Sequence, residues 1–201
     1  MPSDRRDRLL EAALEALRTK GFAGASTRAI AALAGVNPGL IFYYFGTLDD
    51  LLLEALRQSS EARLERYRTA AREARSFPGL VALLRRIYQE DLESGHIRVV
   101  CEMVSAGVAR PEIGRRVMEL MEPWIGLAEE AVQEPLADAQ LPVPVPAREL
   151  AFAAVTFYLG ANLVVHLGTD PPAVDGLLGA AEQGAAWLEL LGGRAGDRPG
   201  S

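Results

Sequence analysis

The sequence predicts an all-α protein with a helix-turn-helix motif near its N-terminus and a larger helical domain after it. Apolar residues recur at spacings of three and four almost throughout the chain, and no alternating strand pattern lasts for six residues. Glycine or proline separates the periodic segments. We therefore expect a first domain at residues 1–47, a second at residues 48–191, and a disordered glycine-rich tail at residues 192–201.

The first helix is expected to begin at Ser3 or Asp4, because either side chain can cap a helix N-terminus. Its apolar stripe consists of Leu9, Leu10, Ala13, Leu14 and Leu17. The helix should end at Lys20 and Gly21, since glycine is favoured just after the last helical residue.

A second, short helix should begin at Ser26 or Thr27 and end at Gly35, with Ala29, Ile30 and Leu33 on its inner side. The next helix follows after only two residues. Asn37 is a favoured N-cap residue, and Pro38 suits the first helical position, where its missing N–H costs nothing. Two helices joined by a tight glycine turn are typical of a helix-turn-helix motif.

A long helix is expected to begin at Thr47, with Asp49 and Asp50 in its first turn, and to reach about residue 75. Punctuation by proline and glycine predicts five further helices, at residues 79–94, 96–108, 111–138, 147–167 and 172–191. Alternate prolines in residues 141–146 predict a stiff, extended connector.

The third helix carries four consecutive aromatic residues, Phe42 to Phe45. On a helical wheel, Phe45 lies on the same side as Val36 and Ile41, which marks the side that faces the core. Phe42 and Tyr43 lie off that side and about 100° apart, so they cannot both be core residues. Tyr44 lies at the flank and could also pack under the following helix.

The segment STRAIAALAGVNPGLIFYYFGTLDDLL, residues 26–52, resembles the DNA-binding segment of the TetR family of bacterial transcriptional regulators. The resemblance covers about residues 8–56. It implies a homodimer that represses transcription by binding a palindromic, double-stranded operator and that releases the DNA when a small-molecule effector enters the larger domain. The DNA-binding residues carried over from the resemblance, together with those we add from their chemistry, are Thr27, Arg28, Asn37, Pro38, Gly39, Leu40, Phe42, Tyr43, Tyr44 and Thr47.

The recognition segment is poor in positive charge. Residues 29–56 contain no lysine or arginine, and Leu48 stands where the family usually has a lysine. Phosphate contacts should therefore come from Thr27, Thr47, tyrosine hydroxyls and helix N-termini, helped by Arg28 and by a mobile arm that carries Arg5, Arg6 and Arg8. Leu40 and Phe42 could contact thymine methyl groups.

Composition argues against several other functions. The net charge is −6, although residues 1–48 carry +2, so the chain does not coat nucleic acid through overall charge. No paired carboxylates, phosphate-binding loop or nucleophile with a neighbouring histidine indicates an enzyme. The single cysteine, Cys101, excludes an intrachain disulfide and fits the cytoplasm; His96 is misaligned with it, and we expect neither a metal site nor a cofactor.

The apolar segment at residues 150–168 is long enough to be weighed as a membrane anchor. Asn162 and His166 within it favour a helix that is buried by dimerisation instead, and we expect no membrane partner. The expected dimer interface comprises Ala154, Phe157, Tyr158 and Ala161 in this helix and the small residues Gly176, Ala180 and Gly184 in the last one.

Bulky residues of the larger domain suggest where an effector binds. Methionine is adaptable packing material, and tryptophan, tyrosine and histidine bring a polar group to an apolar wall. The expected effector-binding residues are Tyr88, Met103, Trp124 and His166, which predicts a mostly apolar ligand. One alternative function stays open at this point, namely an all-helical module that binds another protein through the aromatic run.

Overall fold

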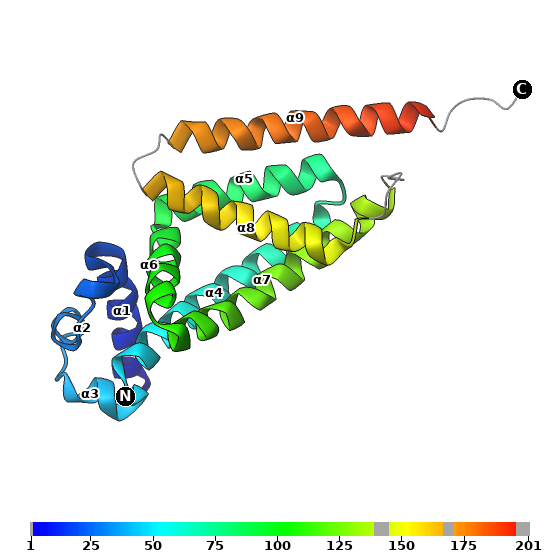
Figure 1. The fold of residues 1–201 in the computed structure, drawn as a ribbon. Coiled ribbons are helices and arrows are strands. Elements are labelled where there is room, and N and C mark those ends of the chain that lie inside the picture. The colour runs from blue at the N-terminus through cyan, green and yellow to red at the C-terminus, as the bar shows by residue number, and fades with distance from the viewer. Residues whose placement is uncertain (1, 139–144, 167–170, 196–201) are drawn as a thin grey trace, which may run out of the picture. The chain divides into compact units, whose positions relative to one another are not determined.

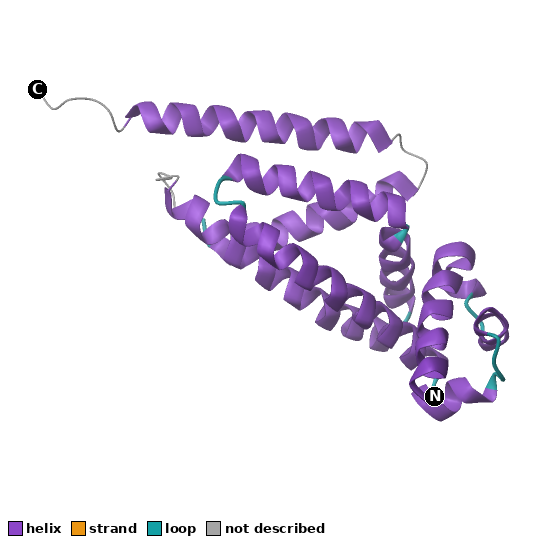
Figure 2. Ribbon diagram, turned by 180° about the vertical axis from the view of Figure 1, so that it is seen from behind, coloured by secondary structure: helices purple, strands orange, loops and turns teal. Residues whose placement is uncertain are grey.

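The computed structural model describes residues 2–138, 145–166 and 171–195, and every regular element in these ranges is a helix (Figure 2). The helices are α1 (Pro2–Gly24), α2 (Thr27–Ala34), α3 (Gly39–Phe45), α4 (Leu48–Glu73), α5 (Phe77–Ser94), α6 (His96–Ala109), α7 (Pro111–Asp138), α8 (Ala147–His166) and α9 (Pro171–Ala195) (Figure 1). The predicted all-α class is confirmed.

The helix positions agree closely with those expected from sequence punctuation. The largest difference is at the C-terminus, where α9 continues to Ala195 beyond the expected end at residue 191. The expected extended connector at residues 141–146 falls mainly on residues outside the described ranges, as do residues 196–201 of the tail.

The chain divides into two compact units. The first comprises residues 1–63 and 91–122, and therefore contains α1 to α3, most of α4, α6 and the first part of α7. The second comprises residues 64–90 and 123–201, which include the end of α4, α5, the rest of α7, α8 and α9. The expected domain boundary after residue 47 rests on the DNA-binding segment alone, and it stays a prediction.

The core of the first unit collects apolar side chains from α1, α2, α3, α4 and α6. Most of the predicted stripe of α1 is buried, including Leu9, Leu10, Ala13 and Leu17, whereas Leu14 is half-buried. Ile30 of α2 and Ile41 of α3 are fully buried. Their burial fixes which faces of α2 and α3 remain outside.

Local signals set the ends of the first three helices. Gly21 interrupts α1 with a φ of 69° and a ψ of 178°, at the position where the sequence predicted that the helix ends. The Ser26 hydroxyl accepts a hydrogen bond from the Ala29 amide, which confirms Ser26 as the cap of α2. Gly35 ends α2 with a left-handed φ of 63°. Asn37 Oδ1 accepts from the Gly39 amide at 2.8 Å and so caps the start of α3.

A polar cluster is buried in the first unit where α4 passes the start of α6. Arg63 and Asp91 form a buried ion pair. His96 is mostly buried, and its Nδ1 lies 3.2 Å from the Ser59 hydroxyl. Burial, and secondarily the positive charge of Arg63, lower the pKa of His96 to about 3. The imidazole is therefore neutral at physiological pH.

In the second unit, α9 is tied to α5 by a bidentate ion pair. Arg85 Nε and Nη2 donate to the two carboxylate oxygens of Asp175, at 2.7 and 2.6 Å, and Gln89 adds a hydrogen bond of 3.1 Å. Val174 and Leu178 of α9 are buried on the same side. The opposite side of α9 therefore remains exposed.

Helix α8 is apolar but poorly covered by the rest of the chain. Over Ala147–Val165 it is long and apolar enough to cross a membrane by length and composition alone, and only 11% of the residues in this window are buried. Its exposed apolar side chains include Phe152, Phe157, Leu163 and Val164. Exposed apolar surfaces of this kind are typical of interaction sites.

Candidate nucleic-acid interface

Helix α3 separates its aromatic side chains into an inner and an outer set. Ile41 is fully buried, whereas Tyr43 is 78% exposed and Phe42 is 55% exposed. Tyr44 is half-buried and contacts the Tyr43 ring edge-to-face, with centroids 4.9 Å apart. The interpretation that Phe42 and Tyr43 point away from the core is confirmed.

Leu33 of α2 belongs to the outer surface, and its predicted inward position is wrong. Its side chain is 48% exposed, while Ile30, Ala31 and Ala34 are buried. Helix α2 has only two turns, so Ile30 and the two alanines are enough to fill its contact with the core. A hydrophobic pattern in so short a helix does not fix the width of the buried stripe.

Most of the other expected DNA-binding residues are accessible. Arg28, Asn37, Pro38 and Gly39 are exposed. Thr27 and Leu40 are half-buried. At the start of α3 the Gly39, Leu40 and Ile41 amides already donate to Asn37 Oδ1, Asn37 O and Pro38 O. Contacts of this segment with phosphate oxygens would therefore come from side chains.

Thr47 has a structural partner at the start of α4. Its hydroxyl donates to Asp50 Oδ2 at 2.6 Å and accepts from the Asp50 amide at 3.1 Å, so the Thr47 side chain caps the start of the helix. These bonds to Thr47, followed by the Arg116 guanidinium, lower the pKa of Asp50. A phosphate contact by the Thr47 hydroxyl stays a prediction and would have to compete with the carboxylate of Asp50.

The expected mobile arm is not present, because α1 begins at Pro2. Arg6 donates to Glu54 Oε1 at 2.7 Å, and its guanidinium lies 5.3 Å from the centroid of the Phe45 ring. The neighbouring Arg57, followed by Arg6, lowers the pKa of Glu54 to about 2. Arg8 lies 3.8 Å from Asp4. Both arginines are engaged within the first unit, and only Arg5 of the three is exposed without a described partner.

Sequence reasoning missed three charged residues of α6 and α7 that contact the ends of the helix-turn-helix. Glu102 accepts a hydrogen bond from the Phe22 amide, Arg110 pairs with Asp49, and Arg116 pairs with Asp50. The partners are separated by 61 to 80 residues in the sequence. No local sequence pattern predicts interactions between residues this far apart in the chain.

The four expected effector-binding residues fall in different parts of the chain. Met103 is buried in the first unit, whereas Tyr88 and Trp124 belong to the second. Tyr88 is buried and its hydroxyl has no hydrogen-bond partner among the described residues. Burial, and secondarily the Asp175 charge, raise the pKa of Tyr88. Trp124 is half-buried beside Tyr67, and the side chain of His166 lies outside the described residues.

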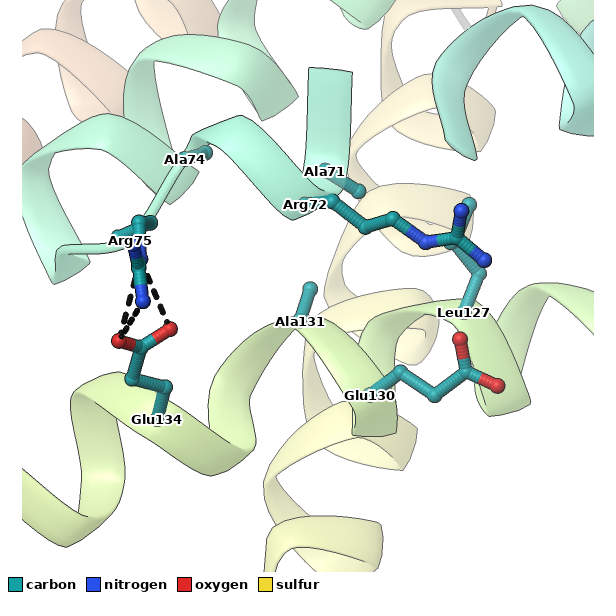
Figure 3. Close-up of a pocket in the computed structure, with 8 residues that line it drawn as sticks. All are labelled: Ala71, Arg72, Ala74, Arg75, Leu127, Glu130, Ala131 and Glu134. Carbon is teal, nitrogen blue, oxygen red and sulfur yellow. Dashed lines mark hydrogen bonds and ion pairs between the residues drawn. The ribbon is translucent and has the colours of Figure 1, made fainter. Parts of the chain in front are cut away.

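A pocket of about 150 Å³ lies in the second unit between the end of α4 and α7 (Figure 3). Its apolar wall consists of alanines and Leu127. Arg75 and Glu134 close one side through a two-pronged ion pair, and Arg72 and Glu130 lie on the other side. None of the expected effector-binding residues lines this pocket.

The predicted dimer surface is exposed on α9 and only partly exposed on α8. Gly176, Ala180 and Gly184 of α9 are exposed, and Leu177 between them is 54% exposed. A Cβ atom added at Gly176 or Gly184 would meet nothing within 4 Å. On α8, Phe157 is exposed, whereas Ala154, Tyr158 and Ala161 are half-buried.

Comparison with known proteins agrees with the helix-turn-helix geometry. The family described as bacterial regulatory proteins, tetR family, matches residues 9–55. The HTH-type transcriptional regulator BetI 1 of Chromohalobacter salexigens is 46% identical over 54 residues, which are 27% of this chain and 27% of that protein.

Solved structures extend the similarity to nearly the whole chain. The multidrug binding protein EbrR, complexed with proflavin, is 30% identical, with a TM-score of 0.61 over 92% of this chain and 99% of that one. The fatty acid degradation regulator FadR from Bacillus halodurans shares the fold, with a TM-score of 0.72 at 18% identity over 88% of this chain and 95% of that one. The chain therefore belongs to the TetR family of bacterial regulatory proteins.

Proposed function

We propose that this protein is a ligand-responsive transcriptional repressor of the cytoplasm. It binds a palindromic operator as a homodimer and is released by a small, mostly apolar effector. The observation that carries the proposal is the exposure of Phe42 and Tyr43 on α3, directly after a capped helix and a glycine turn. A monomeric protein without a partner for this surface would gain by burying two adjacent aromatic rings.

The exposed residues divide into two roles on DNA. Leu40, Phe42 and Tyr43 supply the contacts that discriminate bases, through thymine methyl groups and one hydroxyl. The side chains of Thr27, Arg28, Asn37, Tyr44 and Thr47 contact the sugar-phosphate backbone. Pro38 and Gly39 keep the start of α3 narrow, so the backbone can approach the groove wall. The DNA-binding domain in this proposal is residues 1–47.

The homodimer forms through α8 and α9, within the effector-binding and dimerisation domain of residues 48–191. Exposed Phe157 and Leu177 supply apolar area, and the small residues Gly176, Ala180 and Gly184 allow a close approach of helices. Dimerisation also accounts for the poor coverage of α8 within one chain, without a membrane.

The effector site is proposed to include the Tyr88 hydroxyl. A buried hydroxyl without a partner costs free energy, and a ligand atom that accepts its hydrogen bond would remove that cost. Trp124, of the same unit, is the second residue of this proposal. Met103, of the first unit, and His166, whose side chain lies outside the described residues, stay predictions from the sequence. A multidrug binding relative complexed with proflavin supports an effector of largely apolar or aromatic character.

The deciding experiment is a gel shift with promoter DNA from next to the protein's own gene, using unrelated DNA of the same length as a control. We expect a discrete complex with the promoter fragment, and loss of that complex when Phe42 and Tyr43 are both replaced by alanine. If the wild type shifts neither DNA, the repressor proposal is wrong. Capture of a protein through Phe42 and Tyr43 in place of DNA would favour the alternative of a protein-interaction module.

A further inference from the structure

One charged cluster of the first unit contacts both ends of the helix-turn-helix. We define the clamp as Glu102 of α6, Arg110 at the α6–α7 turn and Arg116 of α7, together with their partners Phe22, Asp49 and Asp50. No member of the clamp lies within residues 27–45, which form α2, the turn and α3. The clamp therefore acts on the recognition unit from outside it.

At the first end, the clamp caps the connection between α1 and α2. The break at Gly21 leaves the Phe22 amide without an acceptor in α1, and Glu102 Oε2 accepts its hydrogen at 2.8 Å. A Cβ atom at Gly21 would lie 2.8 Å from the same oxygen, so glycine provides the room for this contact. Positive φ at Gly21 requires glycine as well.

At the second end, the clamp holds the connection between α3 and α4. Arg110 forms a bidentate pair with Asp49, with Nη1 to Oδ1 at 3.0 Å and a second bond from Nη2 to Oδ2. Arg116 Nη1 donates to Asp50 Oδ1 at 2.6 Å. Asp50 also exchanges two hydrogen bonds with the Thr47 hydroxyl. Bidentate pairs fix orientation as well as distance.

Arg110 links the two ends directly. Its guanidinium lies 5.9 Å from the centroid of the Phe22 ring while it holds Asp49, so one side chain contacts both connections. Partly exposed ion pairs of this kind add little to global stability. Arg110 Nε also donates to Glu112 Oε1 at 3.3 Å. The effect of these contacts is geometric, because a planar guanidinium held by several partners allows few arrangements of them.

We infer that the clamp positions the recognition unit, and that Arg110 is its central positioning residue. One consequence rests on the proposed function: the clamp sets which spacing of operator half-sites the dimer accepts. Glu102 belongs to α6, Arg110 to the turn that follows it, and Arg116 to α7, so a displacement of this segment reaches both ends of the helix-turn-helix together. The clamp thus offers one physical route for the control of DNA binding.

The first test measures hydrogen exchange at the amides of residues 27–45 and needs no DNA. Arg110→Gln and Asp49→Asn should each raise exchange at least threefold there, and the double variant should do no more than either alone. Arg115→Gln is the matched control, because Arg115 is exposed and has no described partner. Unchanged exchange in Arg110→Gln, or additive effects in the double variant, would overturn the clamp.

The second test uses DNA selected by the wild type from a random pool and re-synthesised with one or two base pairs added or removed between half-sites. Arg110→Gln should bind the best spacing 3- to 10-fold more weakly and discriminate less among spacings. Arg115→Gln should keep the wild-type preference despite losing the same charge. If the wild type selects no DNA, the proposed function fails while the exchange experiment still decides the clamp. Equal spacing preference in both variants would overturn the positioning role.

Discussion

Tyr43 and Tyr44 contact each other edge-to-face at an interplanar angle of 79°, yet they differ sharply in exposure. The Tyr43 ring stands outside the protein, whereas the Tyr44 ring is half-buried between Tyr43 and Phe45. The contact fixes the direction of the outer ring at little entropic cost. In the proposed complex, Tyr43 contacts bases, and Tyr44 supports it and contacts the backbone of DNA.

Tyr43→Phe should reduce discrimination at one base pair of the operator. Loss of one hydroxyl contact to a base edge is worth about 1 kcal/mol, or roughly fivefold in relative affinity. Tyr44→Phe should instead weaken all sequences alike. Binding to a library of single-base operator variants measures both effects. An unchanged sequence preference in Tyr43→Phe would show that the aromatic run serves packing alone.

Local sequence signals predicted the helix ends around this site. They did not predict the ion pairs between residues that are distant in the sequence. Ser26, Gly35 and Asn37 act on amides within a few residues, so their chemistry is legible in the sequence. The fate of Arg6 depends on Glu54, which lies 48 residues away, and that of Arg110 depends on Asp49. From the sequence alone, Arg6 is equally compatible with a mobile arm and with an ion pair. Only the three-dimensional structure shows that Glu54 lies beside it.

Gly184→Leu should weaken the dimer without unfolding the protomer. Among the described residues, a Cβ atom at Gly184 meets nothing within 4 Å, so we expect the added side chain to clash with a second copy. Gly126→Leu on α7 is the matched control, because its Cβ is equally unobstructed. Sedimentation at micromolar concentration should show a larger monomer fraction for Gly184→Leu alone. A wild type that is monomeric under these conditions would contradict the assignment of α8 and α9.

Tyr88→Phe should raise the free energy of unfolding by about 1 kcal/mol in the absence of effector. The substitution removes a buried hydroxyl that has no described partner, and it keeps the ring that fills the core. Urea denaturation of the free protein measures the change. Tyr67→Phe is the contrasting variant, because the Tyr67 hydroxyl donates a hydrogen bond to Glu90. Its loss should lower the free energy of unfolding. A destabilised Tyr88→Phe variant would mean that the hydroxyl is already satisfied.

Acid should destabilise the protein between pH 6.5 and pH 4.5 through His96. The unfolded histidine takes up a proton near its ordinary pKa of 6.5, whereas the folded one, with a pKa of about 3, stays neutral. The unfolded state therefore binds more protons in this window, and the free energy of unfolding falls as pH falls, by up to about 1.4 kcal/mol per pH unit.

His96→Gln should flatten this part of the profile while keeping a polar group beside Ser59. Glu54, whose pKa is lowered from 4.5 to about 2, loses its stabilising contribution only at still lower pH, so the two effects separate. Urea denaturation at a series of pH values measures both. The same slope between pH 6.5 and 4.5 in the wild type and in His96→Gln would exclude His96 as its source.

Operator binding should depend on salt less steeply than in a strongly basic repressor. If two to four of Arg5, Arg6, Arg8 and Arg28 contact phosphates in each subunit, the slope of log affinity against log salt is about −4 to −7 for a dimer. The structure reduces that range, because Arg6 is held by Glu54 and Arg8 lies near Asp4. Of these four arginines, Arg5 and Arg28 are exposed without a described partner. Two contacts per subunit give an expected slope of about −4 for the dimer.

Arg28→Gln tests the origin of that slope. It removes one cation per subunit and should make the slope shallower by about 2 units for the dimer, with sequence preference unchanged. Arg6→Gln is the contrasting variant, because Arg6 already neutralises Glu54 and should leave the slope nearly as it is while reducing stability. Gel shifts over a series of salt concentrations measure all three proteins. A wild-type slope steeper than about −7 would show that cations outside residues 1–57 contact the phosphates, since the neutral donors at the helix N-termini release few counterions.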